Sequence, residues 1–160
     1  GGGMAIHGGL LGGVLAGYIY TKVKKLNFFK MADCVVLGIP LAQAIGRWGN
    51  YLNKEAHGGP TDLPWGIMVD GVKVHPTFLY ESIWDLGVFI FLMLFRKKQK
   101  YEGQILVYYI TLYSIGRFFI EGLRTDSLML GPLRMAQVIS LGFILIGVIL
   151  NYVLSKKNKR

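Results

Sequence analysis

The sequence is poor in charged residues, has a single cysteine and contains no internal repeat. Charged residues make up only 17% of the 160 residues, whereas hydrophobic residues make up 52% and the mean hydropathy is +0.43. A soluble core of this size does not need so much apolar surface, which argues against a soluble domain. The few charges fall in blocks between long apolar runs, and this layout is typical of a membrane protein.

The only cysteine, Cys34, lies within an apolar run and has no partner. An internal disulfide and a thiolate metal cluster are therefore excluded, and we interpret Cys34 as a small packing residue. The three histidines are His7, His57 and His75, and they are too scattered to show metal-ligand spacing. We predict no metal site and no cofactor.

A secretory signal peptide is also lacking, and the chain begins with three glycines instead of a methionine, so we expect it to be a fragment. No low-complexity linker or second domain is visible. The absence of a repeat argues against the two-halved plan that is common in transporters. We predict a single integral-membrane domain over residues 1–160.

Five apolar segments are candidates for membrane-spanning helices of about 20 residues, although two of them are short. They cover residues 4–20, 31–46, 76–95, 105–120 and 135–154. The predicted fold is an all-α polytopic membrane helical bundle of about five transmembrane helices. Because the first two segments are rich in glycine, we expect them to pack closely against other helices.

Basic residues predict the orientation of this bundle. Three clusters, in residues 22–30, 96–100 and 156–160, contain 12 of the 18 lysines and arginines. All three fall on one side if every segment spans, and the positive-inside rule makes that side cytoplasmic. The net charge of +9 therefore reflects membrane topology, and a nucleic-acid partner is not predicted.

The long connection over residues 48–75 lies on the opposite, extracytoplasmic side in this topology. Within it, residues 67–74 alternate around Asp70 and Gly71, a pattern that predicts a small β-hairpin with a tight turn. We therefore expect a small extracytoplasmic cap containing a β-hairpin over the bundle.

A polar stripe follows the end of the second segment. Gln43, Arg47 and Asn50 share one face if the helix continues that far, and Gly46 and Gly49 allow other groups to approach closely. Arg47 has no acidic residue nearby in the sequence. A guanidinium without such a partner is better explained by a phosphate, which it binds bidentately.

A second polar stripe, formed by Tyr113, Arg117, Glu121 and Arg124, reaches the same outer level from the fourth segment. Arginines from two helices are therefore expected to converge. The alternative is that Arg117 and Glu121 only neutralise each other within one helix. Both interpretations stay open on the sequence alone.

His7 begins the first segment on the outer side in this topology, level with both arginines. That position makes it a candidate base, although a lone histidine is more often a satisfied core residue. Gly9, Gly13 and Gly17 follow it as a small-residue packing face. Glu81 and Asp85 lie early in the third segment with Tyr80, and either a capping role or support for the arginines is open.

Residues 46–58 read Gly-Arg-Trp-Gly-Asn-Tyr-Leu-Asn-Lys-Glu-Ala-His-Gly. At every fixed position this stretch resembles the signature of the bacterial prolipoprotein diacylglyceryl transferase family. The resemblance extends to essentially the whole chain through residues 7–9, 62–66, 75–76, 79–81 and 116–118, and through Glu121. Phe78 departs from the glutamine that the family often has there. Family members have about seven spans, so this chain looks like the last five, and a functional tyrosine of the family lies in the region that precedes them.

The resemblance implies a reaction in the bacterial cytoplasmic (inner) membrane, on its extracytoplasmic face. The diacylglyceryl group of phosphatidylglycerol moves to the lipobox cysteine thiol of a prolipoprotein, giving a thioether and releasing glycerol phosphate. The implied catalytic residues are His7, as base, with Arg47 and Arg117, as phosphate-binding groups. The implied substrate-binding residues are Arg47, Asn50, Asn53, Glu55, Gly58, Tyr80, Arg117 and Glu121. Asn50 and Glu55 are expected to order the signature loop, and Gly58 to permit its tight geometry.

Two other function classes compete with this interpretation. A membrane channel or transporter for an anionic solute also has intramembrane arginines, but its polar groups continue across the membrane, whereas these cluster at one face. An inactive fragment or structural subunit would explain the glycine-rich segments and the missing spans. It leaves Arg47 and Asn50 without a role.

Overall fold

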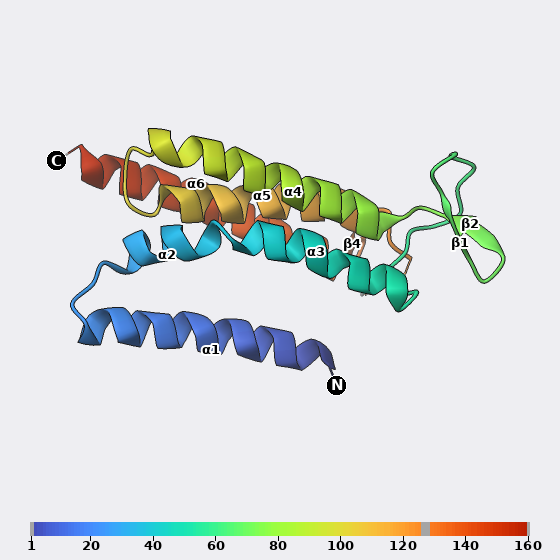
Figure 1. Cartoon of the computed structure of the whole chain (residues 1–160), viewed down its shortest axis with the longest axis horizontal. Helices are drawn as coiled ribbons and strands as arrows, with labels where there is room; N and C mark the ends of the chain where they lie inside the picture. The colour runs from blue at the N-terminus through green and yellow to red at the C-terminus, as the bar shows by residue number, and fades with distance from the viewer. Residues whose placement is uncertain (1, 126–128, 160) are drawn as a thin grey trace.

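The computed structural model describes residues 2–125 and 129–159, with side chains from residue 8 onward. Helices account for most of this part of the chain, and their axes run along one common direction (Figure 1). They are α1 (Gly2–Val23), α2 (Phe28–Val36), α3 (Ile39–Leu52), α4 (Thr77–Phe95), the short 3-10 helix η1 (Arg96–Lys98), α5 (Gln104–Glu121) and α6 (Met135–Asn158). The predicted, mostly helical fold is confirmed.

Two helices are long and apolar enough to cross a membrane: α4 together with η1, and α6. The pair α2 and α3 would form a third span if its bend of 42° lies within one crossing. Length and composition thus support two or three spans in the described residues, and a total of five stays a prediction.

The break between α2 and α3 corrects one expectation. Residues 31–46 were predicted as one segment, but α2 ends at Val36 and α3 begins at Ile39. Pro40 explains the break, because proline has no N–H to donate and fits only the first turn of a helix. After the break, α3 continues to Leu52, so Arg47 and Asn50 do lie on the same helix.

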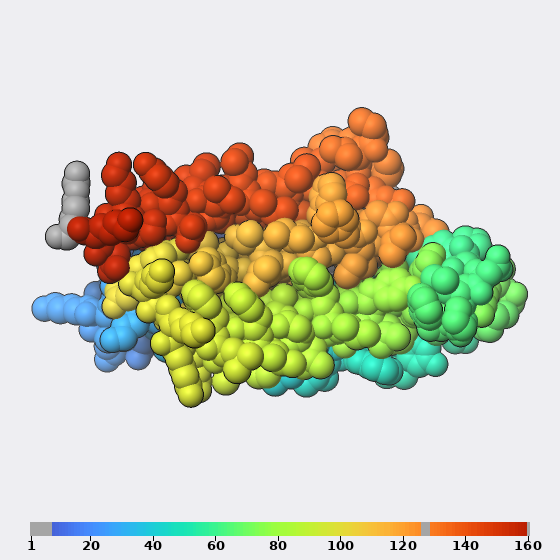
Figure 2. Space-filling view, turned by 90° about the horizontal axis from the view of Figure 1, so that it is seen from above, coloured from blue at the N-terminus to red at the C-terminus, as the bar shows by residue number. Residues whose placement is uncertain are grey.

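The core joins α2, α4 and α5, and its buried residues are Val36, Val88, Leu92 and Ile105. Figures 1 and 2 together show α4 beside α5, and α5 beside α6. Helix α1 stands away from this core (Figure 1). In the part of the chain that the structure describes, no atom lies within 4 Å of a Cβ built at Gly9, Gly13 or Gly17. The expected close packing of this glycine face is therefore absent there.

Asp33 of α2 ties that helix to the start of α5. Its carboxylate accepts hydrogen bonds from the backbone N–H groups of Gly103 (2.7 Å) and Leu106 (2.9 Å). Helix α5 has no side-chain cap from its own first residues. Because the first N–H groups of a helix lack partners within it, a buried carboxylate from another helix stabilises that end.

Within the described residues, four short strands form two hairpins. In the first, β1 (Ile67–Val69) pairs antiparallel with β2 (Val72–Val74), and Ile67 lies opposite Val74. The turn residues Asp70 and Gly71 both have positive φ, of 50° and 81°, which a two-residue hairpin turn requires. The predicted hairpin is confirmed, and it lies beyond one end of the bundle (Figure 1). The second hairpin consists of β3 (Met129–Leu130) and β4 (Leu133–Arg134), which pair antiparallel.

Gly116 lets α4 pack against α5. The Trp84 indole of α4 lies directly over it, and Trp84 Nε1 donates a hydrogen bond to the carbonyl oxygen of Leu112 at 2.9 Å. A Cβ built at Gly116 would lie only 2.1 Å from Trp84 Nε1. Any side chain at position 116 must therefore displace the indole and break this bond.

We predict that Gly116→Ala lowers the stability of the protein by about 1 to 3 kcal/mol, because the added methyl group overpacks this contact. The matched control is Gly87→Ala on α4, where no described atom lies within 4 Å of an added Cβ. Thermal unfolding in detergent measures both. Equal unfolding midpoints for the two variants would contradict the packing argument.

Candidate functional site

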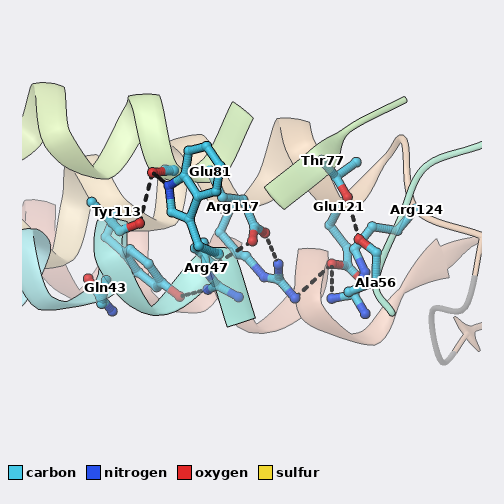
Figure 3. Close-up of polar contacts among 12 residues, drawn as sticks. Gln43, Arg47, Ala56, Thr77, Glu81, Tyr113, Arg117, Glu121 and Arg124 are labelled. Carbon is cyan, nitrogen blue, oxygen red and sulfur yellow. Dashed lines mark hydrogen bonds and ion pairs between the residues drawn. The ribbon is translucent and has the colours of Figure 1, made fainter. Parts of the chain in front are cut away.

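Arg47 of α3 and Arg117 of α5 meet at one carboxylate, that of Glu81 of α4 (Figure 3). Arg47 Nε lies 3.0 Å from Glu81 Oε2, and Arg117 Nη1 pairs with Glu81 Oε1. The Glu81 side chain is only 7% exposed. Three helices thus place two guanidinium groups around one buried negative charge, which is the convergence of arginines that the two polar stripes predict.

The pairing continues along α5. Arg117 Nη2 lies 2.8 Å from Glu121 Oε2, and Arg124 Nη1 lies 3.4 Å from the same oxygen. Basic and acidic side chains therefore alternate in one arginine–glutamate row, which consists of Arg47, Glu81, Arg117, Glu121 and Arg124 (Figure 3). Charge-assisted bonds of this kind hold both carboxylates where few water molecules can reach them.

The row bears on three interpretations made from the sequence, those of Arg47, Glu81 and Arg117. Arg47 does have an acidic partner, so its lack of a neighbouring acid in the sequence is not evidence for a phosphate by itself. Glu81 is placed to support the arginines and does not act as a helix cap. Arg117 pairs with Glu121 within α5, as the alternative expected, but it binds Glu81 of a second helix as well.

Tyrosines of α5 complete the contacts of the α3 stripe. Arg47 Nη2 donates a hydrogen bond to Tyr113 Oη at 3.2 Å, and Tyr109 Oη donates to Gln43 Oε1 at 2.8 Å. The sequence pattern did not single out Tyr109. Its place one turn before Tyr113 on the same face was the signal that could have found it.

Asp85 lies one turn beyond Glu81 on α4 and lines the same small cavity as Arg47, Tyr113 and Arg117. The residue is only 2% exposed. Its Oδ2 atom has no hydrogen-bond partner among the described residues. The structure therefore places a third buried acid beside the arginines, and it excludes the capping role, because Asp85 lies beyond the first turn of its helix.

The signature loop leaves α3 and folds back on itself. The backbone N–H of Glu55 donates to the carbonyl oxygen of Asn50 at 3.0 Å, and Asn53 Nδ2 donates to Glu55 Oε1 at 3.3 Å. Glu55 thus belongs to the loop and does not pair with the row. Asn50 takes part in the loop through its backbone carbonyl oxygen, and its side-chain amide has no hydrogen-bond partner among the described residues.

Gly58 joins this loop to the end of α5. Its N–H donates to the carbonyl oxygen of His75 at 2.9 Å, and it forms a β-bridge with Arg124. A Cβ built at Gly58 would lie 2.5 Å from the Cβ of His75 and 3.0 Å from the carbonyl oxygen of Leu123. The position requires glycine because two backbone segments approach it from both sides.

Two further candidates lie elsewhere. Tyr80 Oη accepts a hydrogen bond from Trp65 Nε1 at 2.9 Å and lies 3.1 Å from His75 Nδ1, so its described contacts are with the cap and not with the row. His7 is in α1, but its side chain is outside the described residues, and its role as base stays a prediction. In the described part of the chain, no group of three or more His, Cys, Asp or Glu residues could hold a metal ion.

Comparison with known proteins supports the resemblance seen in the signature stretch. The model of the prolipoprotein diacylglyceryl transferase family matches residues 1–153. The chain belongs to this family. It is 79% identical over 159 residues to the phosphatidylglycerol–prolipoprotein diacylglyceryl transferase of Clostridioides difficile (strain 630), an alignment that covers 99% of this chain and 64% of that relative.

Two other relatives with the same name are also similar to this chain over most of its length. The chain is 54% identical over 168 residues to that of Clostridium novyi (strain NT), covering 99% of this chain and 65% of the relative. It is 55% identical over 151 residues to that of Finegoldia magna, covering 94% and 61%. The chain therefore spans somewhat less than two thirds of the length of these relatives.

We predict that Glu81→Gln destabilises the protein by about 3 kcal/mol, because it leaves two partly buried guanidinium groups without their shared negative charge. Glu55→Gln is the matched control, since Glu55 is exposed and its loss is expected to change stability by less than about 1 kcal/mol. Thermal unfolding in detergent compares them. A Glu81 variant as stable as the control would show that the row does not hold the three helices together.

Proposed function

We propose that the protein to which this chain belongs transfers the diacylglyceryl group of phosphatidylglycerol to the lipobox cysteine thiol of a prolipoprotein. The products are a thioether and glycerol phosphate. Family membership supports the proposal, and so do the names of the relatives. The structural observation that carries it is that Arg47, which belongs to the signature stretch, meets Arg117 of another helix at Glu81.

Arg47 and Arg117 are the proposed binding groups for the lipid phosphate. Their side chains are 22% and 17% exposed, so both remain accessible although they pair with Glu81. Arg47 uses Nε and Nη2 for Glu81 and Tyr113, and its guanidinium has further N–H donors at Nη1. The five residues of the row carry a net charge of about +1, which complements the single negative charge of a phosphodiester.

In the proposed reaction, the sulfur of the thiolate attacks the glycerol carbon that carries the phosphate. The new C–S bond forms as the C–O bond to the phosphate breaks, and the electron pair stays on the departing phosphate oxygen. A free thiol is mostly protonated at neutral pH, so a base must take its proton, and His7 is proposed for this step. The arginines would stabilise the charge that develops on the leaving phosphate, and Glu81 would hold them in place before the reaction.

The other proposed substrate-binding residues fall into two groups. Glu121 belongs to the row, where it orients Arg117 and pairs with Arg124. The rest lie in the loop after α3 and at the start of α4, and they are Asn50, Asn53, Glu55, Gly58 and Tyr80. We propose that this second group shapes the entrance for the lipid headgroup and the peptide, with the Asn50 amide as a direct contact.

We propose a multi-pass arrangement of five spans in the bacterial cytoplasmic membrane, with the active face outside. The described residues of the three basic clusters lie at one end of the bundle, around the α1–α2 connection, in η1 and the α4–α5 connection, and at the C-terminal end of α6 (Figure 1). The β1–β2 hairpin lies at the other end, near the row. Positive charge collects on the cytoplasmic side of membrane proteins, so this arrangement supports an extracytoplasmic cap.

The test reconstitutes the full-length protein with phosphatidylglycerol and a lipobox peptide, and mass spectrometry detects the added diacylglyceryl group. Arg47→Ala is expected to reduce the rate by about 100- to 1,000-fold, because it removes a cation that stabilises the departing phosphate. His57→Ala is the control, since the only polar partner of the His57 ring among the described residues is the carbonyl oxygen of the neighbouring Gly58. Equal losses in the two variants would count against the proposed site. Flux of an anionic solute without any modified peptide would favour a channel or transporter.

A second expectation concerns the route of the lipid. Because both substrates are held in the membrane, we predict that phosphatidylglycerol enters through a lateral gap between helices and not from water. A photoactivatable phosphatidylglycerol should crosslink to residues of the spanning helices near the row. Crosslinks confined to residues 53–75, the part of the cap connection that follows α3, would contradict lateral entry.

A further inference from the structure

The end of the bundle farthest from the arginine–glutamate row holds a separate cavity of about 870 Å³. Its walls come from α2, the α4–α5 connection, the first turn of α5 and the last turns of α6, which meet at the same end of the molecule (Figures 1 and 2). Apolar side chains form part of its lining: Phe29, Leu37, Ile105 and Leu154. None of the residues assigned to the proposed reaction lines this cavity.

Four basic side chains also line the cavity, and they are Lys30, Arg96, Lys100 and Lys157. All four residues are exposed, and they come from α2, η1, the α4–α5 connection and α6. The ion pairs found among the described residues involve only the arginines of the row. The four cations of the cavity therefore have no acidic partner within the described part of the chain.

Asp33 and Glu102 also line the cavity, but neither carboxylate forms an ion pair with these cations among the described residues. Asp33 is 5% exposed and binds the backbone N–H groups of Gly103 and Leu106 at the start of α5. Glu102 accepts a hydrogen bond from the side-chain amide of Asn27. The four cations and two carboxylates leave the lining with a net charge of +2 (4 − 2), so the cavity combines an apolar wall with an excess of positive charge.

We propose that this cavity binds an anionic phospholipid of the membrane leaflet at the basic end, with the phosphate between the lysines and the first acyl carbons on the apolar wall. Cations that converge at the ends of membrane helices suit a phosphate that lies at the same depth. The apolar wall favours a lipid over free phosphate, since inorganic phosphate gains nothing from apolar contact. The site is separate from the proposed catalytic site and does not depend on the proposed reaction.

Cys34 provides a direct readout, because it lines the cavity and is exposed. The full-length protein, with any other cysteine replaced by alanine, is placed in phosphatidylcholine nanodiscs with or without phosphatidylserine. The rate of Cys34 alkylation by a water-soluble maleimide is then measured. We expect phosphatidylserine to slow alkylation at least about fivefold, since a bound lipid protects the thiol in proportion to its occupancy.

The charge requirement is tested with two triple variants of equal charge. The first removes cavity lysines through Lys30→Gln, Lys100→Gln and Lys157→Gln, and it should lose the protection. The control changes three lysines at the same end that do not line the cavity, through Lys24→Gln, Lys97→Gln and Lys156→Gln, and it should keep the protection. A variant is taken as folded if its alkylation rate in phosphatidylcholine alone equals that of the unmodified protein. If the first triple variant is not folded, the single variant Lys100→Gln replaces it.

Four results would overturn the proposal. The first is equal alkylation in the two kinds of nanodisc, and the second is equal loss of protection in the two triple variants, which would indicate only general attraction to a charged surface. The third is equal protection by inorganic phosphate in phosphatidylcholine, which would assign the cavity to a soluble anion. The fourth is a Cys34 that does not react in phosphatidylcholine, which would show that the protein's own chain fills the cavity.

Discussion

The arrangement of α3, α4 and α5 depends on the ion pairs that the buried Glu81 carboxylate forms with Arg47 and Arg117. This carboxylate lies on α4 and pairs with a guanidinium from each of the other two helices. An unpaired charge at this depth is costly, so neither neighbouring helix can shift without breaking an ion pair. The same contact places Arg47 and Arg117 side by side. Helix packing and the geometry of the proposed site therefore have one common cause.

Helix α5 is held at both ends by acidic side chains of other helices. At its start, Asp33 of α2 accepts hydrogen bonds from the backbone N–H groups of Gly103 and Leu106. Near its end, Arg117 pairs with Glu81 of α4. Between these points, Gly116 allows the Trp84 indole to lie against the helix. These contacts fix both the position and the rotation of α5. As a result, Tyr113, Arg117 and Glu121 all face the proposed site.

The two ends of the bundle differ in how they treat positive charge. Near the cap, the row alternates arginine with glutamate, so the guanidinium groups are oriented and partly neutralised. At the opposite end, the lysines of the large cavity have no described acidic partners, while Asp33 is used by the helix backbone. Orientation suits a group that stabilises charge during a reaction, whereas unpaired charge suits retention of an anionic ligand.

Features that depend on neighbouring residues could be predicted from the sequence, and they are the apolar helices, the hairpin around Asp70, the signature stretch and the polar stripes of two helices. These follow from periodicity and turn chemistry, which act over a few residues. The sequence also predicted a packing face on α1, but the spacing of its glycines does not specify which segment packs against them. The meeting of Arg47 and Arg117 at Glu81, and the contacts of Tyr80 with the cap, became evident only from the packed helices. Such pairs form between distant segments, and they depend on how whole helices pack, which no local pattern contains.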